Sequence, residues 1–219
     1  MNNSLFDYNT FIFDCDGVVL NSNYIKTEAF YETTIEYGKD KANELVKYHI
    51  DRGGISRYEK FKYFITDILD QKFDEKLYNN LTNKFSSLVL KKLSYCEISN
   101  GLHDFRKKTK KSDWLIVSGG DQIELINVFK KRGLNQYFNK GIFGSPESKE
   151  RILEREIVKK GLTSQSVYIG DSKYDFKAAN QFNIDFIFLY EWSEVENYKY
   201  WTKEFNIKFF KNINDLNQL

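Results

Sequence analysis

The stretch TFIFDCDGVVLNSN, residues 10–23, decides the fold class of this chain. Its first four residues are β-branched or aromatic, as in a buried strand. Asp14 and Asp16 follow two positions apart, so in an extended chain their side chains point to the same side. Gly17 then permits a tight exit from the strand. Two carboxylates aimed together repel each other, so the pattern indicates a site for a cation or for phosphate chemistry.

Further apolar runs along the chain resemble the first one, and stretches with helical spacing separate the later runs. Strands that alternate with helices are typical of a parallel α/β sheet, so the predicted fold class is α/β with a Rossmann-like sheet. The predicted strands are residues 11–14, 114–118, 141–145, 166–171 and 185–190, and the predicted helices are residues 122–132, 149–160 and 174–182.

One long interval, residues 21–92, does not alternate. It is charged and has no strand candidate, and its apolar residues recur at helical spacing. The clearest series is Leu77, Leu81, Phe85 and Leu88, with Lys92 next in line. We therefore expect an α/β core domain of residues 1–20 and 93–219, with a helical cap of residues 21–92 inserted into it. The cap either acts as a lid over the strand end that carries the two aspartates or only covers the sheet.

Composition limits the partners of the chain. The 219 residues carry a net charge of +2, and no dense basic patch suggests nucleic acid. No apolar run reaches the length of a membrane span. Cys15 and Cys96 lack metal-ligand spacing. We expect both to be reduced thiols. We expect a cytoplasmic protein that binds neither nucleic acid nor a membrane.

Polar groups follow several of the predicted strands, where open α/β sheets place their ligands. Each group alone is weak evidence, because aspartates often cap turns and a lone lysine is usually solvated. The occurrence of all the groups together, in one order along the chain, is much more specific evidence for a shared site. The groups are Asp14 with Asp16, then Ser118-Gly119-Gly120, then Lys149, then Asp171 with Asp175.

Charge explains why these groups belong together. Asp14, Asp16 and Asp171 would be unstable side by side without a divalent cation, and oxygen ligands suit Mg²⁺. Lys149 would neutralise a docked phosphate, and Ser118 with the following backbone amides would hold its oxygens. One aspartate could then attack phosphorus, while the other protonates the leaving alkoxide and later activates water.

The segments DCDGVVLNS, IVSGGD, GSPESK and GDSKYD resemble the four signature motifs of the haloacid dehalogenase (HAD) superfamily, across nearly the whole chain. The resemblance implies the strand order 3-2-1-4-5, Mg²⁺ as cofactor and an aspartyl-phosphate intermediate. The residues that match the motifs take the following implied roles: Asp14 as nucleophile, Asp16 as general acid/base and as metal ligand through its backbone carbonyl, Ser118 and Gly119 for phosphate, Lys149 for the nucleophile and phosphoryl group, Asp171 for the metal, and Asp175 as a supporting or alternative metal ligand.

The interval 21–92 resembles the helical cap of the phosphoglycolate phosphatase and β-phosphoglucomutase branch of that superfamily. Its segment HIDRGGISRYEKF, residues 49–61, resembles the loop in which an arginine meets the substrate. A plain helix–helix turn is the alternative. Gly54, Arg57 and His49 are therefore candidate specificity residues, whereas Arg52 and Lys60 are expected to be solvated helix charges.

These expectations describe a Mg²⁺-dependent phosphatase that acts on a small phosphate monoester. The predicted substrate is a sugar phosphate or a polyol or amino-alcohol phosphate, and a loose family association suggests surface-polysaccharide precursor synthesis. A phosphomutase of the β-phosphoglucomutase type is the nearest alternative. A non-catalytic phospho-aspartate receiver or binding module is the alternative from another class, although a receiver would be about half as long and lack the helical insert.

Overall fold

The computed structural model describes residues 5–160 and 165–219; residues 1–4 of the expected core segment and residues 161–164 lie outside the described residues. The described chain forms one parallel six-stranded sheet in the order β3-β2-β1-β4-β5-β6. This order contains the expected 3-2-1-4-5 and adds β6, which the sequence analysis missed. The strands are β1 (Thr10–Phe13), β2 (Asp113–Asp121), β3 (Gly141–Ser145), β4 (Ser166–Gly170), β5 (Asp185–Leu189) and β6 (Lys208–Phe210).

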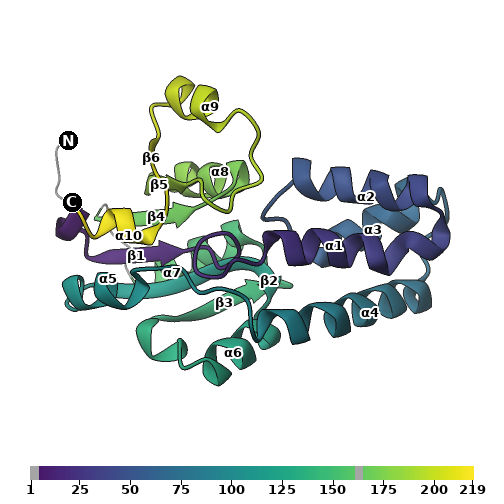
Figure 1. The fold of residues 1–219 in the computed structure, drawn as a ribbon, viewed down its shortest axis with the longest axis horizontal. Coiled ribbons are helices and arrows are strands. Elements are labelled where there is room, and N and C mark those ends of the chain that lie inside the picture. The colour runs from purple at the N-terminus through teal and green to yellow at the C-terminus, as the bar shows by residue number, and fades with distance from the viewer. Residues whose placement is uncertain (1–4, 161–164) are drawn as a thin grey trace.

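Helices cover both faces of the sheet (Figure 1). The side chains of β1 alternate between the two faces and are all buried, which explains the unbroken apolar run in the sequence. Phe11 and Phe13 belong to a cluster with α5 (Leu102–Lys108), α6 (Gln122–Lys131) and α10 (Ile213–Leu216). Ile12 belongs to a second cluster on the opposite face, with α7 (Lys149–Lys160) and α8 (Lys173–Gln181).

Four α-helices lie at the end of the sheet toward which β1 points (Figure 1). We call them, with their short connections, the inserted helices, residues 23–93. They share the larger hydrophobic cluster with the sheet, so the two parts are joined by packed side chains as well as by the chain. The elements are α1 (Asn23–Thr34), η2 (Ile35–Tyr37), α2 (Lys39–Asp51), α3 (Arg57–Tyr63), the π-helix η3 (Phe64–Ile68) and α4 (Glu75–Leu93).

The buried face of α4 differs from the expected series. Leu81 and Phe85 are buried as expected, but the series continues through Val89 and Leu93. Lys92 lies off this face and forms an ion pair with Glu28. The expected series took a step of three from Phe85 to Leu88, whereas the buried residues continue in steps of four; both steps stay near one helix face, and Leu88 lies partly buried at its edge.

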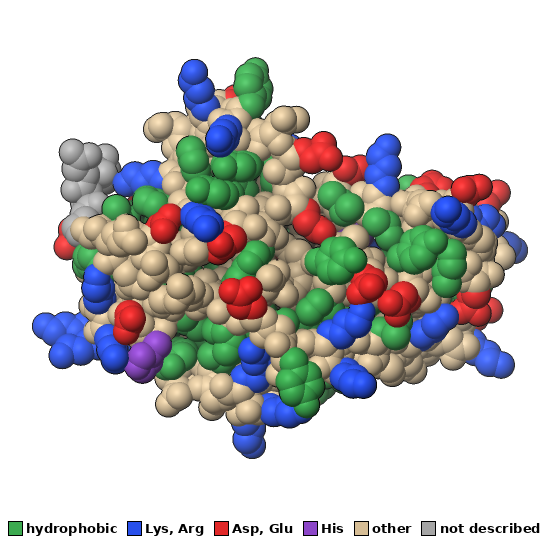
Figure 2. All heavy atoms as spheres, viewed as in Figure 1, with side chains coloured by type: hydrophobic (Ala, Val, Ile, Leu, Met, Phe, Trp, Pro, Cys, Tyr) green, Lys and Arg blue, Asp and Glu red, His purple; other side chains and the backbone are tan. Residues whose placement is uncertain are grey.

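β5 and the chain that follows it form a smaller, mainly aromatic cluster, in which Phe188 of β5 packs against Trp201 of α9 (Tyr198–Glu204). The remaining short elements are η1 (Leu5–Asp7) and η4 (Asn135–Tyr137). None of the described helices is both long and apolar enough to span a membrane. Acidic and basic side chains are mixed over the face shown in Figure 2, in keeping with the small net charge.

Candidate active site

A cavity of about 1150 Å³ lies between the carboxyl ends of the strands and the inserted helices. Most of the predicted site residues line it, from both parts of the chain. Ser118, Lys149 and Asp175 lie buried behind its wall. The predicted residues that line the cavity are Asp14, Asp16, Gly119 and Asp171 from the sheet side, and His49, Gly54 and Arg57 from the inserted helices.

Three buried carboxylates meet at this end of the sheet. Asp14, Asp171 and Asp175 each offer an oxygen, and the three oxygens lie within 4.8 Å of one another. Gly17, with φ of +74°, lets the chain turn directly beside them, because a Cβ at this position would lie 2.1 Å from Oδ2 of Asp171. Asn23 Nδ2 donates a hydrogen bond of 2.6 Å to the same oxygen.

The cluster carries more negative charge than its surroundings balance. Lys149 Nζ lies 3.1 Å from Asp14 Oδ2 and 2.6 Å from Asp175 Oδ1. Burial nevertheless raises the pKa of Asp14 to about 7, and burial with the neighbouring carboxylates raises the pKa of Asp171 well above its usual value. The three carboxylates outnumber the one ammonium, and each offers oxygen atoms as ligands. The cluster therefore fits a divalent cation such as Mg²⁺.

Asp175 has a structural task as well. Ser172 and Asp175 form the capping box at the start of α8, and Asp175 Oδ2 accepts hydrogen bonds from the Ser172 amide and hydroxyl. The other oxygen accepts from Lys149 at 2.6 Å. Both oxygens of Asp175 are thus engaged, so the expectation that it supports the site suits the geometry better than direct metal ligation.

Asp16 faces a different set of partners from Asp14. Its side chain accepts a 2.6 Å hydrogen bond from Ser22 Oγ and forms an ion pair with Lys26 of α1. Burial alone would raise the pKa of Asp16, but the Lys26 ammonium and the Ser22 hydroxyl hold it below the usual value. Asp16 is therefore anionic in this arrangement, ready to accept a proton rather than to donate one.

The predicted phosphate-binding segment lies where β2 ends. The register between β2 and β3 shifts between Val117 and Asp121, so the backbone of the intervening residues leaves the regular ladder. Ser118 is fully buried, and its Oγ accepts a 3.0 Å hydrogen bond from the Gly120 amide. A Cβ at Gly119 would lie 2.1 Å from the Gly54 carbonyl oxygen, so the loop between α2 and α3 rests directly on this segment.

The first turn of α3 is tied to the first turn of α6. Arg57 makes a two-pronged ion pair with Glu124, with 2.8 Å between Nη1 and Oε1, and also donates to Ser86 Oγ at 2.7 Å. Tyr58 donates a 2.7 Å hydrogen bond to Asp121. Arg57 lines the cavity, but its guanidinium is engaged by Glu124; contact with the substrate therefore stays a prediction.

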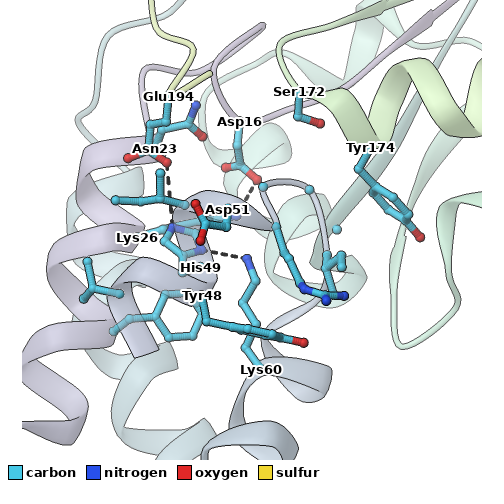
Figure 3. A pocket seen from close by; sticks show the side chains of 18 of the residues that line it. Asp16, Asn23, Lys26, Tyr48, His49, Asp51, Lys60, Ser172, Tyr174 and Glu194 are labelled. Atoms are coloured by element: carbon cyan, nitrogen blue, oxygen red, sulfur yellow. Dashed lines mark hydrogen bonds and ion pairs between the residues drawn. The ribbon is translucent and has the colours of Figure 1, made fainter. Parts of the chain in front are cut away.

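Lys60 is not the solvated helix charge that the sequence analysis expected. Its side chain is 1% exposed, and Nζ lies 2.6 Å from Nδ1 of His49, which is also buried. The expectation was wrong because Lys60 lies on the face of α3 that turns toward the cavity (Figure 3). Burial and the nearby Lys26 ammonium together lower the pKa of Lys60 to about 7.

Sequence reasoning also missed Asn23, Lys26 and Glu194, which line the cavity. Asn23 and Lys26 had a usable signal. They lie three residues apart in α1, the first helix after the aspartate pair, so they share one face of that helix. Glu194 follows β5 and reaches Thr27 Oγ1 at 2.7 Å, a contact across 167 positions that no local pattern encodes.

The family model described as "Haloacid dehalogenase-like hydrolase" matches residues 11–189 of the chain. This match spans most of the 219 residues and includes all four predicted motifs. The chain therefore belongs to the haloacid dehalogenase-like hydrolase family, as the motifs indicated. Among proteins with curated descriptions, no sequence matches the chain.

Several solved structures share the fold at low identity. A β-phosphoglucomutase from Clostridium difficile has a TM-score of 0.75 at 20% identity, over 95% of this chain and 93% of its own. A predicted phosphatase from Clostridium acetobutylicum has a TM-score of 0.73 at 16% identity, over 96% and 97%. YfnB of Bacillus subtilis, a HAD-family protein bound to magnesium, has a TM-score of 0.61 at 17% identity, over 91% and 99%.

Proposed function

We propose that the chain is a Mg²⁺-dependent phosphatase that hydrolyses a small phosphate monoester through an aspartyl-phosphate on Asp14. One observation carries the proposal: three buried carboxylates and one buried lysine meet at the end of β1, beside a cavity between the sheet and the inserted helices that Asp14 and Asp171 line. Mg²⁺, when held by Asp14, Asp171 and the backbone carbonyl of Asp16, would offset the charge of the phosphate.

In the first step an oxygen of Asp14 attacks phosphorus, and the bond between phosphorus and the leaving oxygen breaks. Asp16 gives its proton to that oxygen, which leaves as an alcohol. Asp16 then takes a proton from water as the water oxygen attacks phosphorus, and the bond between Asp14 and phosphorus breaks to release phosphate. Because Lys26 holds Asp16 in the anionic form, this contact has to loosen before Asp16 can carry the proton of the first step.

The inserted helices are proposed to act as a cap, with residues 21–92 as its extent and the rest of the chain as the core domain. The close approach of Gly54 to Gly119, and the Arg57–Glu124 ion pair, support a closed arrangement over the strand ends. A cavity roofed in this way favours a small phosphorylated metabolite, such as a sugar phosphate or a polyol or amino-alcohol phosphate, over a phosphoprotein.

A panel of small phosphate esters tests the proposal, with release of inorganic phosphate as the readout. We expect turnover with Mg²⁺, none after EDTA, and none for Asp14→Asn, while Asp104→Asn on the exposed side of α5 serves as the matched control. A phosphomutase, the second candidate on the same residues, would convert one ester into its isomer without net phosphate release. Full activity in EDTA would refute the metal assignment.

A further inference from the structure

Lys60 is a buried cation without a carboxylate partner. Among the described residues, its ammonium has His49 Nδ1 at 2.6 Å and the ring of Phe30 at 5.5 Å, and no acidic group within ion-pair distance. The other buried cations of the site differ in this respect, since each has at least one carboxylate partner. Those pairs are Lys26 with Asp16, Arg57 with Glu124, and Lys149 with Asp14 and Asp175.

His49 holds Lys60 in place. Burial, together with the Lys60 and Lys26 charges, lowers the pKa of His49 well below its usual value, so its ring is neutral. Nδ1 can then accept from Lys60, while Nε2 carries the ring proton and lies 3.1 Å from Thr27 Oγ1. Thr27 in turn donates to Glu194 at 2.7 Å. The lysine is therefore oriented by a chain of contacts that ends on the sheet side of the cavity.

A buried ammonium without a carboxylate in direct contact is unfavourable, and the more distant Glu194 and Asp16 charges offset its burial only in part. An anion that enters the cavity would supply the missing direct partner. The scissile phosphate does not fill this need, because Lys149 on the core side already serves it. Lys60 belongs to the inserted helices and lines the cavity from their side (Figure 3). The group that meets Lys60 must therefore come from the alcohol part of the ester.

We propose that the alcohol part of the substrate carries an anionic group of its own, a carboxylate or a second phosphate, which Lys60 binds while His49 positions the lysine. This inference rests on the proposed function and narrows its substrate class. It favours phosphorylated sugar acids, hydroxy acids or bisphosphates over neutral polyol phosphates, and it opposes amino-alcohol phosphates, whose ammonium would face Lys60.

Matched pairs of esters test the charge of the alcohol part. The pair 3-phosphoglycerate and glycerol 3-phosphate differs only in a carboxylate, and fructose 1,6-bisphosphate and fructose 6-phosphate differ in a second phosphate. For at least one pair we expect kcat/KM to favour the anionic member by about 10-fold or more. Lys60→Met should lower this ratio by about 10- to 100-fold, whereas Lys62→Met on the exposed side of α3 should leave it unchanged.

Further variants separate binding from a merely structural effect. Lys60→Gln keeps polarity without charge and should lose the same preference. His49→Asn, which retains an acceptor near Nδ1, should keep more of the preference than His49→Leu. If neither pair shows a preference for the anionic member in the unmodified protein, or if Lys60→Met and Lys60→Gln both leave the preference intact, the inference is wrong.

Binding to the Asp14→Asn protein distinguishes this inference from the proposed function. Calorimetric titration with 3-phosphoglycerate and with glycerol 3-phosphate, each in the presence of Mg²⁺, yields an affinity ratio without turnover. An anionic preference in binding, together with no hydrolysis of any ester by the unmodified protein, would overturn the proposed function and leave the anion site standing. Hydrolysis of all esters without such a preference would overturn the anion site and leave the proposed function standing.

Discussion

At the scale of single residues, partners decide what each carboxylate and each amine of the site can do. Asp14 faces Lys149, whereas Asp16, two positions on, faces Ser22 and Lys26. The two aspartates both line the cavity but are surrounded by different partners. In the proposed mechanism, this difference would allow one of them to act as nucleophile and the other to transfer protons.

Substitution of each aspartate by asparagine should separate these roles. Asp14→Asn should abolish turnover, since an amide oxygen is a poor nucleophile. Asp16→Asn should slow turnover by roughly 10²- to 10⁴-fold while phosphate still binds, because only proton transfer is lost. Phosphate release and calorimetric phosphate binding measure the two effects. An Asp14→Asn protein as active as the unmodified one would place the nucleophile elsewhere.

Lys60 should make the stability of the fold depend on pH. Its pKa is lowered from the unfolded value of 10.5 to about 7, so the folded protein binds fewer protons than the unfolded chain between these values. Stability should therefore rise with pH across this window. The groups that contact Lys60 or act on it by their charge are His49 of α2, Lys26 of α1, Glu194 after β5, and Asp16 and Lys149 of the core.

Lys60→Met removes the charge that folding disfavours. We expect it to raise the free energy of unfolding by on the order of 2–5 kcal/mol at pH 6, and by less at pH 10. Urea unfolding at both pH values measures the difference, with Lys62→Met as the control that should show none. A Lys60→Met protein that is less stable at pH 6 would mean that the ammonium has a stabilising partner in the folded state.

At the scale of elements, the joint between α3 and α6 holds the inserted helices against the sheet. Arg57 and Tyr58 of one helix reach Glu124 and Asp121 at the start of the other. Asp121 is the N-cap of α6 and directly follows the predicted phosphate-binding segment of β2. These four side chains therefore join the inserted helices to the end of β2 that carries that segment.

A double-mutant cycle tests the joint. Arg57→Met and Glu124→Gln should each lower the free energy of unfolding by on the order of 1–3 kcal/mol, since each leaves a buried polar partner unpaired. The double variant should lose less free energy of unfolding than the two single variants lose together, and the difference, the coupling energy, should be about 0.5–3 kcal/mol. Strictly additive losses would show that the ion pair does not contribute to the joint.

The same Arg57 variant tests the specificity role expected from the sequence. If Arg57 contacts the leaving alcohol, Arg57→Met should lower kcat/KM for the best natural ester by more than for p-nitrophenyl phosphate, whose good leaving group needs little help. An equal decrease in kcat/KM for both esters would mean that Arg57 only holds α3 against α6 and does not contact the leaving alcohol.

At the scale of the whole molecule, one hydrophobic cluster runs from the sheet into the inserted helices, while the acidic cluster lies between them. Packing of the hydrophobic cluster stabilises the folded state, whereas repulsion between the unbalanced carboxylates destabilises it. A divalent cation would remove this conflict, so metal binding and folding stability should be linked.

Mg²⁺ should therefore raise the melting temperature. At 100-fold excess over its dissociation constant, stabilisation of about 2.7 kcal/mol is expected, which for a chain of this size is a shift of roughly 5–10 °C. Asp171→Asn should raise the melting temperature of the metal-free protein, because it relieves repulsion, and should remove most of the Mg²⁺ increment. Thermal unfolding with Mg²⁺, and with NaCl at the same ionic strength, measures both. An equal shift in NaCl would refute a specific site.

The sequence by itself determined the strands β1 to β5, the helices that separate the later ones, and the meeting of Asp14, Asp16, Ser118, Lys149 and Asp171 at one edge of the sheet. These follow from local periodicity and from the rule that parallel strands end on the same side, so no distant contact had to be known. It also placed a helical segment between β1 and β2.

Tertiary structure decided the rest. β6 is three residues long with largely exposed side chains, and only its pairing with β5 defines it as a strand. Lys60 has the helical spacing of a surface lysine and is buried only because α3 turns that face to the cavity. Arg57 meets Glu124 across 67 positions. Short-range sequence patterns show which residues share one face of a helix or strand. The packing of the whole chain decides which two faces come into contact, and therefore which partner each charged side chain meets.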